Sequence, residues 1–164
     1  MTLTLLGGLM KSKTIRNGLI IVPLSVLRSW EAESEKVLKS CVPRAHVYVV
    51  SSDMGRELRY KHLQKALECT SKQPHLVIST YGLVVSSHLD FCNERLSWDY
   101  VVLDEAHTIK NPSAQVSKSC RRICRSKDTR RLILTGTPIM NNLKELWALM
   151  DFATSSKLLG TQQA

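Results

Sequence analysis

The sequence predicts an α/β fold in which a parallel sheet lies between two layers of helices. Short apolar runs alternate with longer segments that have helical periodicity. The run Val101-Val102-Leu103 is apolar without alternation, as expected for a strand that helices cover on both faces. Regular strand–helix alternation is typical of parallel sheets whose strands are joined by crossover helices.

Five strands and five helices follow from these patterns. The strands are expected at residues 19–22, 47–50, 76–80, 100–103 and 132–135, and the helices at 25–39, 56–69, 83–93, 114–125 and 143–152. Ser25 is expected to cap the first helix, Pro112 with Ser113 to open the fourth, and Asn141-Asn142 to cap the fifth.

Composition limits the classes of function. A chain of 164 residues is expected to form one domain with a real core. Its net charge of +9 suits a polyanion such as nucleic acid, although a solvated basic surface explains the charge equally well. No apolar stretch is long enough for a membrane span, and no signal peptide is expected. The five cysteines form no Cys-x-x-Cys pair, which favours reduced thiols over a zinc site.

Two adjacent acids, Asp104 and Glu105, follow the strand expected at 100–103, with His107 close behind. Ligands of parallel α/β sheets bind beyond the carboxyl ends of the strands. Hydrolysis of a nucleoside triphosphate needs one carboxylate for Mg²⁺ and another group to orient the attacking water. Taken alone, however, two acids after a strand are more often an ordinary exposed strand end.

The last expected strand leads into Thr135-Gly136-Thr137, which places two hydroxyls and a glycine at a second strand end. These hydroxyls could bond His107 or a carboxylate and sense the state of a nucleotide. The alternative is a simple Gly-Thr-Pro turn. The two strand ends together are more specific than either one.

Four segments match the motifs of one family. Residues 21–33 resemble motif Ia, 77–81 motif Ib, 104–111 motif II with its extension, and 134–147 motif III. On these residues the chain resembles lobe one of the Swi/Snf-like ATPases, DEAH-box members of helicase superfamily two that move along double-stranded DNA. The resemblance covers residues 3–161, and residues 151–161 most resemble the Cockayne-syndrome-B-like branch.

The resemblance implies an N-terminal helicase lobe with a RecA-like, P-loop NTPase fold. It implies ATP and Mg²⁺ as cofactors, double-stranded DNA or chromatin and protein complexes as partners, and a nuclear location. The implied roles are Mg²⁺ binding for Asp104, hydrolysis for Asp104, Glu105 and His107, coupling for Thr135, Gly136 and Thr137, and DNA binding for Pro23, Ser25, Thr80 and Tyr81. Packing roles are expected for Trp30, Trp98 and Trp147, and a basic face, solvated or phosphate-binding, for Lys118, Arg121, Arg122 and Arg125.

One expected part of such an ATPase has no match. Residues 7–14 approach the phosphate-loop pattern, but Ser12 replaces its second glycine and no helix is expected to follow. Instead, residues 2–10 resemble the helix that comes after the loop in the family. Residues 1–161 are therefore expected to form a partial lobe one, with 162–164 as a tail. The loss of a central strand with the loop should leave two unpaired sheet edges and hold MgATP weakly.

These observations lead to one main function and an alternative. The chain is expected to be a fragment of an ATP-dependent double-stranded DNA translocase of chromatin remodelling or DNA repair, and to be inactive alone. The alternative is a short non-catalytic isoform, or a truncated gene model, that keeps only a DNA- or partner-binding surface.

Overall fold

The computed structural model describes residues 1–92, 97–136 and 143–155, and it contains one parallel five-stranded sheet. The strand order is β2-β3-β1-β4-β5, and every neighbouring pair is parallel. The strands are β1 (Asn17–Val22), β2 (His46–Val50), β3 (His75–Thr80), β4 (Tyr100–Leu103) and β5 (Arg130–Ile133). The predicted α/β class, with a parallel sheet, is confirmed.

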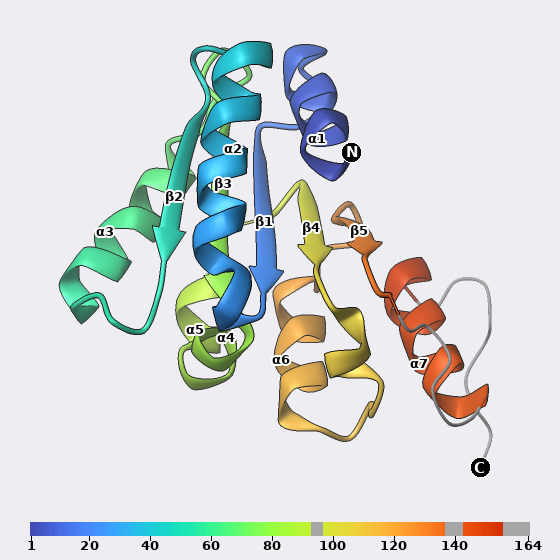
Figure 1. Cartoon of the computed structure of the whole chain (residues 1–164). Helices are drawn as coiled ribbons and strands as arrows, with labels where there is room; N and C mark the ends of the chain where they lie inside the picture. Colours follow the sequence, from blue (N-terminus) through green and yellow to red (C-terminus); the bar gives the residue numbers. More distant parts are fainter. Residues whose placement is uncertain (93–96, 137–142, 156–164) are drawn as a thin grey trace.

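Helices connect and cover these strands (Figure 1). They are α1 (Thr2–Lys11), α2 (Leu27–Cys41), α3 (Arg56–Leu67), α4 (Tyr81–Ser86), α5 (His88–Phe91), α6 (Gln115–Ile123) and α7 (Leu143–Thr154), with 3₁₀ turns η1 (Leu24–Val26) and η2 (Ala106–Ile109). Among the described residues, none of the helices has the length and apolar character needed to cross a membrane.

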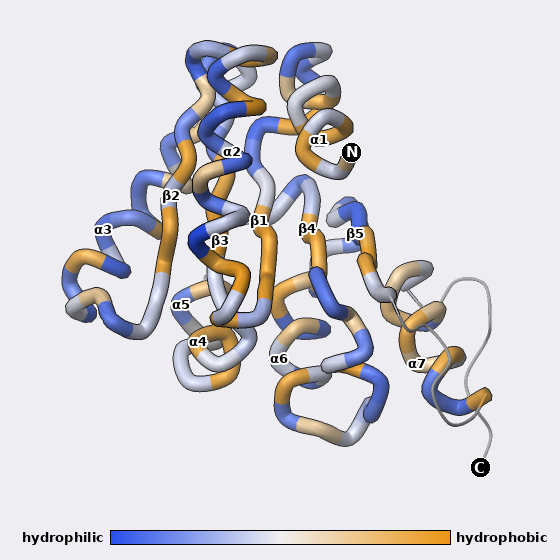
Figure 2. The backbone as a smooth tube through the Cα atoms, viewed as in Figure 1, coloured by the Kyte–Doolittle hydropathy of each residue, from blue (hydrophilic) through white to orange (hydrophobic). Residues whose placement is uncertain are grey.

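Alternate residues of β1 enter two separate cores, which makes the molecule three-layered. Ile20 and Val22 pack with α1 and α2 on one face, whereas Leu19 and Ile21 face the core formed with α3 to α7. All six residues of β1 are buried. Figure 2 shows the hydrophobic colour concentrated along the strands and the hydrophilic colour on the connection that follows β4.

Residues 7–14 do not form a phosphate loop. Gly7 and Gly8 lie inside α1, which ends at Lys11. A Cβ atom on Gly7 would approach Cβ of Cys41 to 3.3 Å, so this glycine allows α1 to pack closely against α2. The rejection of this near-match is confirmed, as is the helix expected over residues 2–10.

Several local predictions were wrong. The sheet is continuous from β2 to β5, so among the described strands there is no gap where a central strand is missing. Ser25 lies in η1, and no side chain caps α2. The fourth predicted helix begins only at Gln115, because Asn111 Oδ1 first accepts a hydrogen bond from the Ser113 amide in a turn.

Other boundaries also moved. The helix predicted over 83–93 is divided into α4 and α5, and it begins at Tyr81 because the Thr80 hydroxyl caps it. β5 begins two residues before the predicted strand, since Arg130 and Arg131 pair with Tyr100 and Val101 despite their charge. Asn141 and Asn142 lie outside the described residues.

Two arginines fasten α7 to the rest of the domain. Arg121 of α6 donates a hydrogen bond of 2.6 Å to Asp151, and Arg131 of β5 donates one of 3.0 Å to the Phe152 carbonyl. Both guanidinium groups lie over the Phe152 ring, at 6.0 and 5.3 Å from its centroid. Arg121 therefore belongs to an internal contact and not to a fully solvated basic face.

Candidate functional site

Predicted site residues lie at the carboxyl ends of four of the strands. Pro23 follows β1, Thr80 ends β3, Asp104 follows β4, and Thr135 lies two residues after β5. Because the strands are parallel, their carboxyl ends meet at the same edge, where the connection after β4 is seen in Figure 1. The structure thus brings the segments of the predicted hydrolytic, coupling and DNA-binding residues together.

Asp104 is held in place by hydrogen bonds from several elements. Its amide donates to the Ile21 carbonyl of β1 at 2.9 Å. Its Oδ2 accepts a bond of 2.8 Å from the Trp30 indole, and its Oδ1 accepts one of 3.0 Å from the Glu105 amide. The Tyr81 hydroxyl donates to its carbonyl at 2.6 Å. Asp104 is therefore a fixed carboxylate, partly exposed, at the end of a buried strand.

Trp30 has a role that sequence analysis missed. It packs against the core between the sheet and α1 and α2, as predicted, but its indole N–H is directed at Asp104. A partly buried indole N–H generally finds an acceptor, and that rule was the available signal. The sequence could not name the acceptor, because Asp104 is 74 positions away along the chain.

Tyr81 and Thr80 are both buried, with 8% and 5% of their surface exposed. The Tyr81 hydroxyl is engaged by the Asp104 carbonyl, and burial raises the pKa of Tyr81 well above its ordinary value, so this group remains a neutral donor. The Thr80 hydroxyl accepts a bond of 3.4 Å from the Leu83 amide. In this structure both hydroxyls are used inside the domain.

Pro23 and Ser25 occupy the connection between β1 and α2. Pro23 is half-buried, whereas Ser25 is exposed in the 3₁₀ turn η1. Of the four residues predicted to bind DNA, Ser25 is therefore the one whose hydroxyl faces solvent.

Glu105 has a left-handed backbone, with φ 49° and ψ 51°. This conformation is uncommon for a residue with a side chain and recurs at functional sites, although Lys13 and Ser155 also have positive φ in this structure. Glu105 Oε2 approaches His107 Nδ1 to 3.2 Å, without the alignment of a hydrogen bond. Both side chains are partly exposed, at 47% and 40%, but His107 Nδ1 itself is buried and has no hydrogen-bond partner.

The segment after β5 is joined directly to the acidic box. The Leu134 amide donates to the Leu103 carbonyl at 2.8 Å, and the Ala106 amide donates to the Leu134 carbonyl at 2.9 Å. Thr135 is half-buried and Gly136 is exposed, whereas Thr137 lies outside the described residues. The backbone therefore links the two predicted strand ends, as expected.

The carboxylate oxygens of Asp104 are suitable ligands for a Mg²⁺ ion that arrives with a nucleotide. Each carboxylate oxygen receives one bond from the protein and keeps one lone pair. Nowhere in the described residues do three His, Cys, Asp or Glu side chains converge as a metal cage. Mg²⁺ commonly binds proteins through one or two carboxylates, with waters and substrate phosphates as its other ligands.

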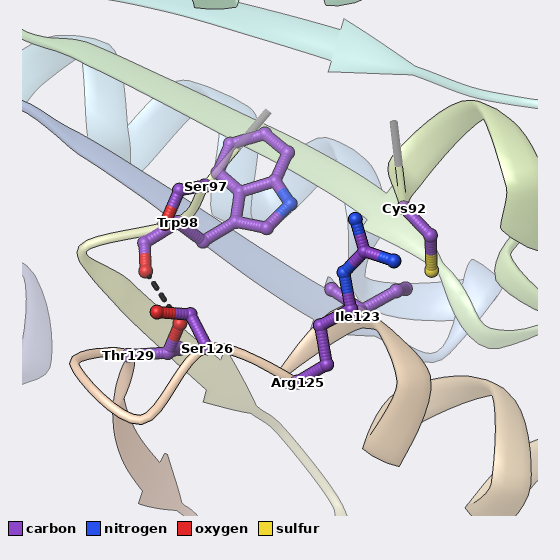
Figure 3. A pocket seen from close by; sticks show the side chains of 7 residues that line it. All are labelled: Cys92, Ser97, Trp98, Ile123, Arg125, Ser126 and Thr129. Carbon is purple, nitrogen blue, oxygen red and sulfur yellow. Dashed lines mark hydrogen bonds between the residues drawn. The ribbon is translucent and has the colours of Figure 1, made fainter. Parts of the chain in front are cut away.

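A separate pocket lies at the opposite end of the sheet (Figure 3). Trp98 lies two residues before β4 and Thr129 directly before β5; both line the pocket, which is therefore remote from Asp104. The Thr129 hydroxyl donates to the Trp98 carbonyl at 2.8 Å. Its full lining is Cys92, Ser97, Trp98, Ile123, Arg125, Ser126 and Thr129.

Comparison with known proteins decides the family. Residues 1–163 match the model of the SNF2-related domain. The chain belongs to the SNF2-related domain family. The resemblance to Swi/Snf-like ATPases that the motifs predicted is thereby confirmed.

Individual curated proteins are also similar to this chain. The zebrafish (Danio rerio) DNA excision repair protein ERCC-6-like is 31% identical over 164 residues, which are 98% of this chain and 10% of that protein. The yeast (Saccharomyces cerevisiae) DNA repair and recombination protein RAD26 is 42% identical over 98 residues, 59% of this chain and 8% of RAD26. The chain thus spans about a tenth of the length of these curated relatives.

Solved structures of the same family share the fold of this chain. The SWI2/SNF2 ATPase core of Sulfolobus solfataricus in complex with double-stranded DNA superposes with a TM-score of 0.67 and 28% identity, over 94% of this chain and 28% of that one. A second structure, of the Sulfolobus solfataricus SWI2/SNF2 ATPase core domain, gives a TM-score of 0.63 at 26% identity, over 98% of this chain and 28% of that one. The RecA-like lobe predicted from the sequence is confirmed.

Proposed function

We propose that this SNF2-related domain supplies the hydrolytic acids and part of the DNA surface of an ATP-dependent double-stranded DNA translocase of chromatin remodelling or DNA repair. The observation that carries the proposal is the fixed carboxylate of Asp104 at a sheet edge shared with Pro23, Ser25 and Thr135. The relatives named for DNA repair and the neighbour solved with DNA support it.

In the proposed reaction Asp104 holds Mg²⁺ and Glu105 orients the attacking water. A Mg²⁺ ion, when bound, neutralises charge that develops on the transferred phosphoryl group. Asp104 can serve it because its carboxylate is fixed by neighbours on two sides and still has free lone pairs. Glu105 is partly exposed beside His107, so its carboxylate can bond a water molecule that approaches from solvent. We propose that ATP hydrolysis is coupled to movement along DNA by His107 together with Thr135, Gly136 and Thr137.

The proposed DNA contact is centred on the connection from β1 to α2. Ser25 is exposed there, as is 72% of the Arg28 side chain, whose guanidinium pairs on the surface with Glu31 at 2.9 Å and Asp53 at 3.7 Å. Hydroxyls, amides and cations at such positions contact phosphates and fix orientation without reading bases. We therefore propose binding to duplex DNA independent of sequence, by a protein that acts in the nucleus and in protein complexes.

Fluorescence anisotropy with a short labelled duplex tests the DNA surface. The chain should bind with an affinity that falls steeply with salt, because phosphate contacts release counterions. Ser25→Glu, which places a negative charge opposite the phosphates, should raise the Kd by roughly fivefold or more at low salt. Ser40→Glu is the matched control, since Ser40 is an exposed serine near the other end of α2. Equal effects of the two substitutions would contradict the proposed surface.

A fluorescent ATP analogue tests the acids. The chain by itself has no phosphate loop that matches the pattern, so binding should be weak, dependent on Mg²⁺, and without measurable turnover. Asp104→Asn should weaken this binding further, whereas Asp128→Asn, at an exposed acid before β5, should not. Tight binding with DNA-stimulated turnover by the chain alone would contradict this expectation.

A further inference from the structure

Two aromatic side chains connect the expected DNA-facing segments with Asp104. Trp30 lies in the first turn of α2, five residues after Ser25, and Tyr81 is the first residue of α4, directly after Thr80. The Trp30 indole reaches the Asp104 carboxylate and the Tyr81 hydroxyl reaches the Asp104 carbonyl. Each bond therefore joins the first turn of a helix to the connection after β4.

These two bonds constrain different parts of Asp104. The bond from Trp30 sets the rotation of the carboxylate, since it engages Oδ2 while the Glu105 amide engages Oδ1. The bond from Tyr81 holds the peptide that joins Asp104 to Glu105, just before the left-handed residue. A shift of α2 would therefore turn the carboxylate, and a shift of α4 would move the Glu105 backbone.

We propose that Trp30 and Tyr81 are positioning residues that transmit a shift of α2 or α4, caused by duplex DNA, to the Asp104–Glu105 pair. The inference rests on the proposed function, because it takes duplex DNA as the ligand at these connections. Rigid packing favours such transmission: Tyr81 is buried, and Trp30 is packed against the core beneath α2.

The test uses the ¹⁵N-labelled chain and a short duplex. Saturating duplex should shift the amide resonance of Glu105 and the indole resonance of Trp30. Trp30→Phe and Tyr81→Phe each remove one donor while keeping an aromatic ring. Each should at least halve the Glu105 shift, and the double variant should abolish it, with the duplex Kd changed less than twofold. Loss of binding in the double variant would also contradict the assignment, because it would make these residues part of the DNA surface.

Trp147→Phe and Tyr60→Phe are the matched controls, since Tyr60 is 57% exposed and Trp147 lies on α7. Both controls should keep the full shift. A Glu105 shift of undiminished size in the double variant would overturn the proposal, as would a wild-type Trp30 indole resonance that does not move with bound duplex. A wild-type chain that binds no duplex would instead refute the proposed function, and this inference with it. Thermal unfolding of each variant establishes that it is folded.

Discussion

The Arg121 guanidinium lies 2.6 Å from the carboxylate of Asp151, whose side chain is only 7% exposed. This contact joins α6 to α7, and Arg121 also donates a bond of 3.3 Å to the Ala148 carbonyl. Lys110 of the connection after η2 reaches Glu145 of α7 at 3.2 Å. Ion pairs and an arginine–aromatic contact thus hold α7 beside the segment that carries the acidic box.

Arg121→Met should destabilise the chain by roughly 2–4 kcal/mol, because it leaves the Asp151 carboxylate buried without its partner. The free energy of unfolding in urea, measured at neutral pH, reports this change. Lys39→Met is the control, since Lys39 pairs with Glu35 on the surface and 74% of its side chain is exposed. A surface pair contributes little, so equal losses for the two variants would contradict the assigned role.

Glu105→Gly should make the folded chain more stable by about 1 kcal/mol, because glycine adopts the left-handed backbone without steric cost. Glu105→Gln removes the same charge but keeps the side chain, so its stability should remain near wild type. Urea unfolding of both variants separates backbone strain from charge. A gain of the same size for glutamine would show that repulsion between charges, and not the backbone, is relieved.

Thr80→Val should cost about 1 kcal/mol of stability, because α4 loses the hydroxyl that accepts from the Leu83 amide. Thr80→Ser keeps a capping hydroxyl and should retain most of that stability. Since Thr80 is 5% exposed, we expect Thr80→Ser to bind duplex DNA with the wild-type Kd. Thermal unfolding and anisotropy measure the two effects independently. A stable Thr80→Val variant that no longer binds duplex would reassign this hydroxyl to DNA.

His75 should make stability depend on pH. Its ring is buried against His46 and Tyr48, at centroid distances of 5.6 and 5.4 Å, and burial lowers its pKa below the ordinary 6.5. The unfolded chain therefore binds this proton more readily than the folded chain does. The contribution of neutral His75 to the free energy of unfolding is therefore complete above about pH 6.5, and it decreases as the pH falls below that value.

Urea unfolding between pH 7.5 and 5.5 measures this dependence. His75→Phe should reduce the slope of stability against pH in this range. His62→Gln leaves His75 in place and should keep the slope. An unchanged slope in His75→Phe would show that other groups cause the dependence.

Hydropathy patterns and strand–helix alternation were sufficient to predict all five described strands and the helical regions after β1, although one predicted helix is divided into α4 and α5. They did not predict α1, which was expected only from the family resemblance. The predicted elements arise from local sequence, because the two faces of each strand and the helical stripes must be apolar. Boundaries that depend on one side-chain hydrogen bond were less accurate: the Asn111 turn delayed α6, and the Thr80 cap advanced α4.

The candidate site was predicted only in part, for a similar reason. The acids directly follow a strand in the sequence, so Asp104 and Glu105 could be proposed as site residues from sequence alone, and they stay a prediction. The partners of Asp104 were not, because Trp30 and Tyr81 come from helices that only the tertiary fold brings to it. The sequence predicts packing for Trp30, and the family resemblance implies DNA contact for Tyr81.

The central position of β1 has a consequence for how the chain must fold. β1 pairs with β3 on one side and with β4 on the other, and its first residue, Asn17, bonds Asp99, 82 positions later. During synthesis Leu19–Val22 therefore emerges long before its second neighbour exists. An apolar strand that waits in this way is prone to pair with other chains, and closing so long a loop slows folding. The same strand that fixes the amide of Asp104 in the finished domain is thus an aggregation risk while the domain is being made.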